Sequence, residues 1–397
     1  MKNNRTFLEK LLDGAEVEWK PLGDVCNFQN GFAFKSSLFK DNGAPIVRIT
    51  NIDGKEVNLS DVKYFLLDDY NTDMTPYKVH KGDILIAMSG ATTGKIGFYN
   101  YEHPSYLNQR VGKFLPNTNI LNNRYLYHYL LSKVEDIYII SGGGAQPNLS
   151  SNRLMSEVLI PIPPLSVQTE IVKILDALTA LTSELTSELI LRQKQYEYYR
   201  EKLLSHNDSE NSSQQKVDKD KLFSTSNIQW LHLNEIYKFQ YGIGNKIPTI
   251  GGEYPVYGSN GIVGSHNEYN SEDAPVIGHI GAYAGIVNWA EGKHFVTYNG
   301  IICNKINDNV NSRYAYYLLL SQNFIDKANK ASQPFISYDI LNKCIVPVPP
   351  IEEQQRIVSI LDKFETLTNS ITEGLPLAIE QSQKRYEYYR ELLLNFS

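Results

Sequence analysis

KQYEYYREKLL (residues 194–204) returns almost unchanged as KRYEYYRELLL (residues 384–394). Nine of the eleven positions are identical, although the two copies lie 190 residues apart. Tyrosine and arginine are common anchors of protein interfaces, and the charged residues between them are typical of a partly exposed helix. A phrase that occurs once in each half of the chain predicts a duplicated architecture.

The duplication extends through both halves. The first half contains four further blocks, EWKPLGDVCNFQNGFAFK (18–35), NNRYLYHYLLS (122–132), GGAQPNLS (143–150) and LIPIPPLSVQTEIVKILDALTAL (159–181). The second half contains their counterparts in the same order, QWLHLNEIYKFQYGIGNK (229–246), NSRYAYYLLLS (311–321), KASQPFIS (330–337) and IVPVPPIEEQQRIVSILDKFETL (345–367). The offset between the halves changes from 211 to 186 along the globular stretch, so the interiors differ by insertions and deletions.

A long helix is predicted after each proline-rich block. PIPPL (161–165) can end a strand and start a helix, because proline is tolerated in the first helical turn. From Ser166 onward, apolar residues at steps of three and four form one narrow face, which predicts a helix of about 40 residues, or about 60 Å. Such a stripe favours pairing with the second copy, in which Gly374 and Pro376 predict a kink or break.

The first helical stretch carries a tandem repeat, LTSELTSEL (181–189). A four-residue unit lengthens a helix by about 6 Å and rotates its stripe by about 40°. The stretch is either an ordinary solvated helix with leucine spacing or a spacer whose length sets the separation of two globular domains.

The chain therefore predicts an α+β fold with two pseudo-symmetric globular α/β domains separated by two long antiparallel helices that form a coiled coil. Because the helical phrase precedes each globular block, we also expect the two termini to lie close together. The expected divisions are a first domain with a short N-terminal helix (1–157), a first helix (158–205), a polar linker (206–221), a second domain (222–343) and a second helix (344–397).

Composition narrows the class of protein. The formal net charge of −6 argues against a protein that coats nucleic acid indiscriminately, but it leaves room for a local reader. No apolar run approaches the ~20 residues that span a bilayer, and we see no signal peptide, so a cytoplasmic protein is expected. The widely spaced Cys26, Cys303 and Cys344 predict buried free thiols, with neither disulfides nor a metal site.

Motifs for catalysis are not found. MSGATTGKIG (88–97) departs from a phosphate-binding loop, because three residues separate Gly90 from Gly94 and Ile96 follows Lys95. Its counterpart HIGAYAGIV (279–287) keeps the glycines, so a tight turn after an apolar strand is predicted in both halves. The sequence has no methyltransferase N/D-P-P-Y/F signature and no H-E-x-x-H spacing, which indicates a protein that is not an enzyme alone.

The blocks PIPP…Q…IVKILD and QYEYYREKLL, alternating with two diverged globular stretches, resemble the specificity (S) subunit of Type I restriction–modification systems over essentially the whole chain. The resemblance implies two target-recognition domains that each read one half of a bipartite double-stranded DNA sequence, with the helices as a rigid ruler between them. It implies docking of two methylation subunits and, in the full complex, of restriction subunits. This chain would hold no cofactor, and the methyl donor and ATP would bind to the partner subunits. The tandem TSEL resembles the short helix repeats of that family.

Given this resemblance, polar and aromatic residues in exposed loops are the candidate DNA contacts, because base edges and phosphates are bound by such side chains. In the first domain they are Lys35, Ser36, Arg48, Ser89, Thr92, Thr93, Lys95, Gln109, Arg110, Gln146 and Asn148. In the second domain they are Tyr241, Lys246, Ser259, Asn260, His279, Tyr283, Tyr298, Asn299 and Gln333. A structural role is the alternative for each, and the recurring Gln-Pro pairs suit a shared turn as well as a shared phosphate contact.

The repeated phrase offers a surface of a different kind. Because identical segments cannot distinguish two half-sites, we expect them to face protein rather than DNA. The candidate residues for docking a methylation subunit are Tyr196, Tyr199, Arg200, Tyr386, Tyr389 and Arg390, with intramolecular helix packing as the alternative. Two other functions stay open at this point, a structural adaptor that holds partner proteins apart and, less in keeping with the missing motifs, a fused single-chain restriction enzyme.

Overall fold

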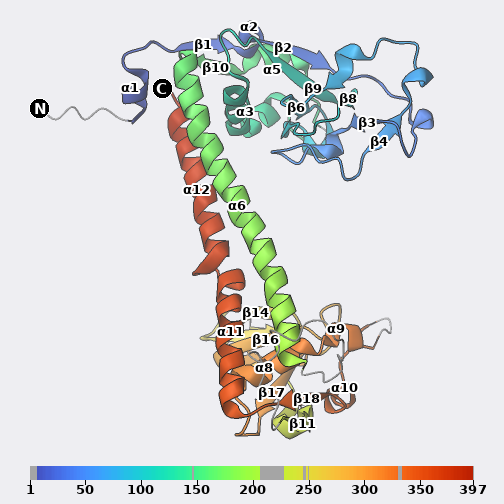
Figure 1. Cartoon of the computed structure of the whole chain (residues 1–397), viewed down its shortest axis with the longest axis vertical. Helices are drawn as coiled ribbons and strands as arrows, with labels where there is room; N and C mark the ends of the chain where they lie inside the picture. The colour runs from blue at the N-terminus through green and yellow to red at the C-terminus, as the bar shows by residue number, and fades with distance from the viewer. Residues whose placement is uncertain are drawn as a thin grey trace, which may run out of the picture. The chain divides into compact units, whose positions relative to one another are not determined.

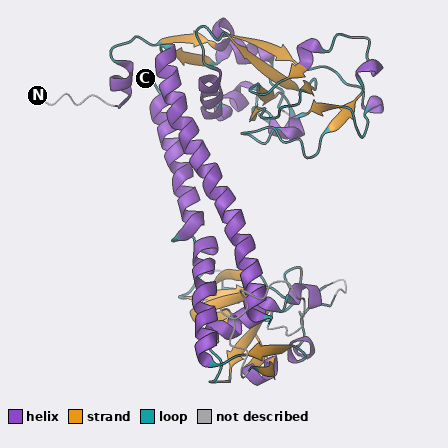
Figure 2. Cartoon of the chain, in the orientation of Figure 1, coloured by secondary structure: helices purple, strands orange, loops and turns teal. Residues whose placement is uncertain are grey.

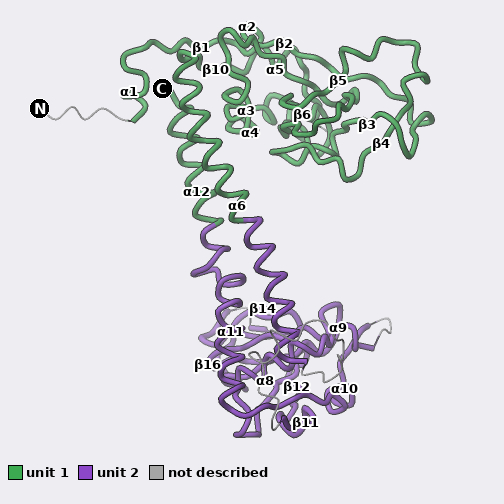
Figure 3. Tube along the Cα trace, in the orientation of Figure 1, with its two compact units in different colours: residues 1–185, 379–397 green, residues 186–378 purple. Residues whose placement is uncertain are grey.

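The computed structural model describes residues 7–144, 147–205, 228–244, 247–248, 250–329 and 333–396. The chain divides into two compact units (Figure 3), unit 1 with residues 1–185 and 379–397 and unit 2 with residues 186–378. The predicted linker, 206–221, lies outside the described residues. The finer division into five segments stays a prediction.

Unit 1 combines three small sheets with short helices (Figures 1 and 2). Its strands are β1 (Glu18–Pro21), β2 (Cys26–Asn30), β3 (Ala44–Val47), β4 (Lys63–Phe65), β5 (Lys78–Val79), β6 (Ile84–Ala87), β7 (Ile96–Phe98), β8 (Ser105–Leu107), β9 (Val111–Pro116) and β10 (Leu159–Ile162). Its short helices are α1 (Phe7–Leu12), α2 (Leu22–Val25), α3 (Asn123–Ser132), α4 (Val134–Ile140) and α5 (Ser151–Glu157). The sheet orders are β1-β10, β2-β9-β6-β7 and β4-β3-β8-β5.

Unit 2 has a two-stranded sheet like the β1-β10 sheet of unit 1, and one larger sheet. Its strands are β11 (Gln229–His232), β12 (Tyr237–Tyr241), β13 (Tyr254–Gly258), β14 (Gly261–His266), β15 (Ser271–Gly278), β16 (Val287–Val296), β17 (Gly300–Lys305) and β18 (Ile345–Val348). Its helices are α7 (Leu233–Ile236), α8 (Ser312–Ser321), α9 (Phe324–Lys327), α10 (Tyr338–Asn342) and α11 (Ile351–Asn369). The sheet orders are β11-β18 and β12-β17-β15-β16-β13-β14.

Two long helices belong partly to each unit. α6 (Leu165–Leu204) is one continuous helix of 40 residues, which confirms the predicted length. The second repeat is not continuous, because residues 370–373 separate α11 from α12 (Gly374–Leu394). The break confirms the interruption that Gly374 and Pro376 predict.

The start of one long helix and the end of the other pack into the same core. In unit 1 the buried core side chains from α6 and α12 are Ile171, Leu175, Leu393 and Leu394. In unit 2 those from α11 and α6 are Ile357, Leu361, Leu203 and Leu204. α6 and α12 run antiparallel in unit 1. Ser382 of α12 contacts Thr182 of α6, whereas the later residue Tyr386 and the earlier residue Asp176 both bond to His128. The predicted apolar stripes therefore pair the two copies.

A buried glutamine fixes the start of α6 to the rest of unit 1. The Gln168 side chain is fully buried, and its Oε1 accepts a hydrogen bond from the Asn122 amide at 2.8 Å. Its Nε2 donates to the carbonyl oxygens of Ile120 (2.9 Å) and Pro163 (2.8 Å). Asn122 in turn caps α3 with its side chain. One amide group thus joins the helix, the proline turn and the α3 cap.

Gln354 makes the same three bonds in unit 2. Its Oε1 accepts from the Asn311 amide at 2.7 Å, and its Nε2 donates to the carbonyl oxygens of Asn309 (3.1 Å) and Pro349 (2.8 Å). Asn311 caps α8, as Asn122 caps α3. In each glutamine, both Nε2 hydrogens and the Oε1 atom therefore bond to backbone groups.

Replacing Gln354 with leucine should destabilise unit 2 by roughly 3 kcal/mol or more, because three backbone groups lose a partner and each costs about 1–3 kcal/mol. The neighbouring Gln355 is exposed, so Gln355→Leu is a matched control with an expected effect within about 0.5 kcal/mol. Urea unfolding followed by circular dichroism measures both. Equal stability of the two variants would contradict the interpretation.

The break between α11 and α12 requires glycine. Gly374 has a φ of +83°, and a Cβ there would lie 2.5 Å from the Thr366 carbonyl oxygen and 2.8 Å from that of Leu367. Gly374→Ala should lower the melting temperature by several degrees. Gly14→Ala is the control, because Gly14 has a φ of +84° but open space around it. Both variants carry the left-handed backbone cost of about 1–2 kcal/mol, so their difference isolates the clash, and no difference would refute it.

Candidate nucleic-acid interface

Residues 87–95 form a tight turn after β6, which we call the unit 1 turn. Gly94 N–H donates to the Ala87 carbonyl oxygen at 2.9 Å, and Ala87 N–H donates to that of Lys95 at 3.0 Å. Thr93 N–H closes a further bond to Gly90 at 3.1 Å. Gly90 and Gly94 both have positive φ, so the glycines serve the backbone. The predicted turn after an apolar strand is confirmed.

Residues 278–286 repeat this scaffold as the unit 2 turn. Gly285 N–H donates to Gly278 at 2.9 Å, Gly278 N–H to Ile286 at 2.7 Å and Ala284 N–H to Gly281 at 3.0 Å. The side chains differ at equivalent positions. Thr92, Thr93 and Lys95 in unit 1 correspond to Tyr283, Ala284 and Ile286 in unit 2. One backbone design therefore displays two sets of side chains.

The recurring Gln-Pro segments support both turns through their backbone. Pro147 accepts a hydrogen bond from Gly90 N–H at 3.1 Å, and Pro334 accepts the equivalent bond from Gly281 N–H at 2.9 Å. The prolines thus have a structural role, whereas a phosphate contact of the glutamines stays a prediction. Gln333 is exposed, and Gln146 lies outside the described residues.

Several candidates of unit 1 gather around its turn. The Arg110 carbonyl oxygen accepts from Met88 N–H at 2.8 Å, and Ser89 forms a β-bridge with Asn148. Arg110, Asn148 and the adjacent Gln109 are exposed. Arg110 makes no ion pair within the described part of the chain. The structure thus brings a free guanidinium and two amides beside the turn.

Two further segments complete this side of unit 1. The Val47 carbonyl oxygen accepts from Asn108 N–H at 3.0 Å, which places Arg48 near Gln109. Phe32 bridges to Asn108, and the Lys35 N–H that follows is held by the Tyr70 hydroxyl at 2.9 Å. Lys35 and Ser36 are exposed.

Some polar atoms at the unit 1 turn lack partners. Ser89 Oγ, Thr92 Oγ1 and Arg48 Nε are buried and make no hydrogen bond among the described residues. Thr93 differs, since its hydroxyl donates to the Gly90 carbonyl oxygen at 2.7 Å and is buried in a structural role. An unpaired buried group costs about 1–3 kcal/mol, and native proteins contain few of them. Two of these atoms, Ser89 Oγ and Thr92 Oγ1, belong to the turn itself, so it keeps unused hydrogen-bonding groups.

Aromatic rings surround the unit 2 turn. His279 is 6% exposed, and its Nδ1 donates to the Tyr298 carbonyl oxygen at 3.1 Å. The Tyr241 ring lies 4.4 Å from the His279 ring and stacks on Tyr338 at 4.2 Å with an interplanar angle of 14°. Tyr283 and Tyr298 remain 50% and 46% exposed. His279 therefore organises the cluster from inside, whereas Tyr283 and Tyr298 face solvent.

The other candidates of unit 2 lie around the same turn. The Asn299 carbonyl oxygen accepts from His279 N–H at 2.8 Å, and Ser259 approaches Gly278 so closely that a Cβ there would lie 2.6 Å from its carbonyl oxygen. Ser259 and Asn299 are half-buried, and Asn260 is exposed. Lys246 lies outside the described residues.

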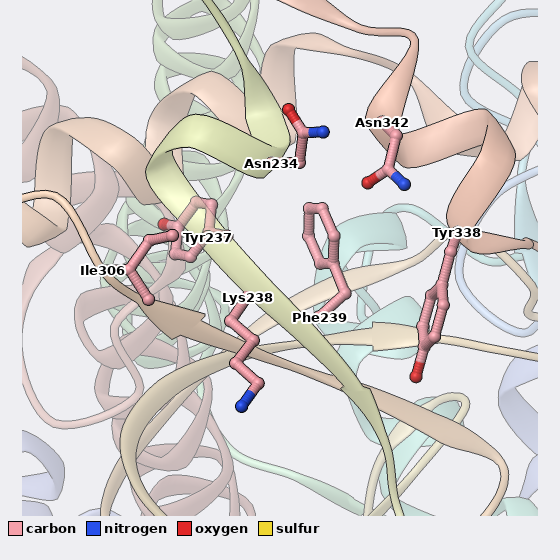
Figure 4. A pocket seen from close by; sticks show the side chains of 7 residues that line it. All are labelled: Asn234, Tyr237, Lys238, Phe239, Ile306, Tyr338 and Asn342. Atoms are coloured by element: carbon pink, nitrogen blue, oxygen red, sulfur yellow. The ribbon is translucent and has the colours of Figure 1, made fainter.

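A shallow pocket of about 320 Å³ adjoins this cluster (Figure 4). It shares Tyr338 with the aromatic stack. Its lining residues are Asn234, Tyr237, Lys238, Phe239, Ile306, Tyr338 and Asn342. The pocket contains none of the predicted DNA contacts and no cluster of acids or nucleophiles, so it adds no chemistry to the site.

In unit 2, part of the first copy of the repeated segment (residues 194–204) is buried by packing within the unit. Tyr196 is 7% exposed and lies against Phe364, on which Tyr199 also stacks at 5.7 Å. The Arg200 guanidinium lies over the Tyr196 ring at 5.3 Å. Tyr198, on the other face of the helix, is 57% exposed. The alternative of intramolecular packing thus describes Tyr196 well, and Tyr198 is the tyrosine that faces solvent.

The second copy of the repeated segment (residues 384–394) packs in the same way in unit 1. The Tyr386 hydroxyl lies 3.0 Å from His128 Nδ1, and the Arg390 guanidinium lies 5.4 Å from the Tyr386 ring. Tyr389 is half-buried, whereas Tyr388 is 63% exposed. Sequence reasoning missed Tyr198 and Tyr388. Their spacing of two residues from Tyr196 and Tyr386 is the signal that they lie on a different helical face.

His128 joins the repeated phrase to unit 1. Its side chain is fully buried, and Nε2 donates to Asp176 Oδ1 at 2.8 Å. Burial lowers the pKa of His128, although the bond to Asp176 opposes the shift. Burial would raise the pKa of Asp176, but hydrogen bonds from His128 and Arg124 outweigh it and lower this pKa to about 2. Unit 2 has Tyr317 in the equivalent place, bonded to Asp362.

Three further findings limit other readings of the molecule. Cys26, Cys303 and Cys344 are buried free thiols, as predicted. The described residues contain no group of histidine, cysteine and acidic side chains that could hold a metal ion. No helix in the described ranges combines the length and the apolar character needed to cross a bilayer.

A duplicated unit with a common turn scaffold, diverged turn side chains and near-identical helical segments defines a two-domain recognition protein. The family described as Type I restriction modification DNA specificity domain matches residues 15–195 and 233–381. The chain belongs to this family. It is 40% identical to a putative type I restriction enzyme specificity subunit of Haemophilus influenzae, with 100% of both chains covered.

Other similar proteins belong to the same family. The chain is 32% identical to the specificity subunit of the Escherichia coli type I restriction enzyme EcoR124I/EcoR124II, over 98% of this chain and 97% of that one. The structure resembles the crystal structure of a type I restriction–modification S subunit from M. genitalium, with a TM-score of 0.58, 19% identity and 96% of each chain covered. The latter likeness concerns the fold.

Acidification should weaken unit 1 through His128. In the unfolded chain the histidine has a pKa of about 6.5, whereas burial lowers the pKa of His128 in the folded protein. The unfolded state therefore binds a proton more readily, and the free energy of unfolding decreases as the pH falls below about 6.5. His128→Tyr, which copies Tyr317, should reduce this loss between pH 7.5 and 5.5. The control is His103→Tyr at an exposed position. Urea midpoints at both pH values measure the effect, and an unchanged pH dependence in His128→Tyr would refute it.

Proposed function

We propose that this chain is the DNA specificity subunit of a Type I restriction–modification complex, and that each unit reads one half of a bipartite double-stranded target. The observation that carries the proposal is the pair of turns. Their backbone hydrogen bonds are equivalent, whereas their side chains differ at positions such as Thr92 and Tyr283. Two readers of different half-sites need a common scaffold and different base contacts. Membership of the family supports the same conclusion.

The long helices would set the gap between the half-sites. α6 is continuous and contains the tandem TSEL, so its length is a property of the sequence. A rigid protein element of fixed length selects a fixed spacing along the DNA helix, as in other proteins with two reading heads. The unread gap in the target would then follow from the helix rather than from either turn.

The repeated phrase would dock the methylation subunits. Its two copies present the same residues to solvent, above all Tyr198 and Tyr388, together with the half-buried Tyr199 and Tyr389. Identical surfaces in both halves suit two copies of one partner. In this proposal the chain is not catalytic alone, restriction subunits join the full complex, and methyl donor and ATP bind to the partners.

Methylome sequencing of cells that express this chain with its methylation subunit tests the proposal. The expected result is one bipartite methylated motif with an unread gap. Inserting one further TSEL after Leu189 should widen the gap by about two base pairs, since the helix grows by about 6 Å, and leave both half-sites unchanged.

Two outcomes would contradict this. Absence of any sequence preference in methylation and footprinting would favour a structural adaptor. Altered half-sites with an unchanged gap would show that the helix is no ruler.

A further inference from the structure

The two turns differ in chemistry and not merely in sequence. The unit 1 turn and its neighbours present Lys95, Arg110 and Gln109, which are cationic or amide side chains. The unit 2 turn, residues 278–286, contains no lysine or arginine, and its exposed large side chain is Tyr283. Tyr298 adds a second exposed ring, which packs against His279 of the turn. The two DNA half-sites would therefore meet surfaces that recognise different groups.

Arg110 is well placed to read a base in unit 1. Its backbone carbonyl is tied to Met88 at the base of the turn, while its side chain is exposed and has no ion pair within the described residues. Arginine binds guanine through O6 and N7 with two parallel hydrogen bonds, and its planar fork makes this pairing specific. A rigid backbone and a free guanidinium are the two requirements for such a contact.

Unit 2 offers a preorganised aromatic surface instead. His279 is buried, binds the Tyr298 backbone and packs edge to face on its ring at 5.1 Å. Tyr241 fills the space between His279 and Tyr338 and receives support from the Tyr338 hydroxyl, which accepts from Tyr241 N–H at 2.7 Å. The exposed ring of Tyr298 packs on this base through His279 and Tyr241, and the exposed Tyr283 lies four residues after His279 on the turn. In the major groove the apolar group that such rings can contact is the C5-methyl of thymine.

We propose that the units read their half-sites by different chemistry, unit 1 through guanine N7 and O6 at Arg110 and unit 2 through thymine methyl groups at Tyr283 and Tyr298. The inference rests on the proposed function and names the base groups that each unit recognises. The second half-site must then contain at least one A·T pair.

The test uses the methylation complex and duplexes of the motif found by methylome sequencing. Exchanging residues 228–344 for those of another family member first identifies the half-site of unit 2. Deoxyuridine in place of thymine removes only the C5-methyl, and 7-deazaguanine removes only the N7 acceptor. Deoxyuridine in the unit 2 half-site should weaken binding about fourfold per contacted methyl. 7-deazaguanine in the unit 1 half-site should weaken it about fivefold or more.

Variants connect each effect to its residue. Tyr283→Ala combined with Tyr298→Ala should bind thymine and uracil duplexes equally, while keeping its sensitivity to 7-deazaguanine. Arg110→Met keeps most of the length of the side chain but removes every hydrogen-bond donor, so it should lose the 7-deazaguanine effect. Tyr269→Ala removes another exposed tyrosine of unit 2, which packs on Tyr254 and Lys293, and should respond like the unchanged chain.

The outcomes separate the two levels of the proposal. A unit 2 half-site without an A·T pair, or equal binding of thymine and uracil duplexes by the unchanged chain, would overturn the role of the tyrosines. A 7-deazaguanine effect that persists in Arg110→Met would overturn that of Arg110. Loss of bipartite recognition altogether would instead reject the proposed function.

Discussion

The arrangement within each unit depends on one buried side-chain amide. Gln168 and Gln354 each bind three backbone groups, from the loop before a helix cap, from the cap residue and from the proline turn. The bonds couple the first turn of a long helix to the globular part of its own unit. Because a buried amide with lost partners costs far more than an exposed one, the helix cannot tilt freely against the unit. A recognition domain whose position is set by a long helix needs such a rigid connection to that helix.

The turns show a second division of labour, between backbone and side chain. Gly94 and Gly285 close the scaffold with the same hydrogen bonds, and Pro147 and Pro334 brace it from a neighbouring loop. Gly285 also approaches the backbone at Phe324 so closely that a Cβ would lie 2.5 Å away. Since these contacts involve the main chain, the side chains on the turn can change without loss of its shape. That property would let one fold acquire many DNA specificities.

The candidate site could be found from the sequence only in part. The glycines and the apolar strand before them identify the turn, and the repeat shows that it occurs twice. Exposure could not be read in the same way. Thr93 bonds to its own turn, His279 lies inside an aromatic cluster, and Tyr196 packs on Phe364, although each looked available. Burial depends on residues far away in the chain, which no local pattern contains.

The sequence by itself determined the duplication, the two long helical segments and the break at Gly374, because these follow from repeats, helical periodicity and the backbone limits of proline and glycine. The class of protein came from the resemblance of the repeated blocks to a known family. Tertiary structure alone decided which side chains face outward. It assigned Tyr198 and Tyr388 to the surface, brought Arg110 beside the unit 1 turn and stacked Tyr241 on Tyr338. The physical reason is that exposure and stacking arise from long-range packing, whereas helix and turn formation are set mainly by neighbours in the chain.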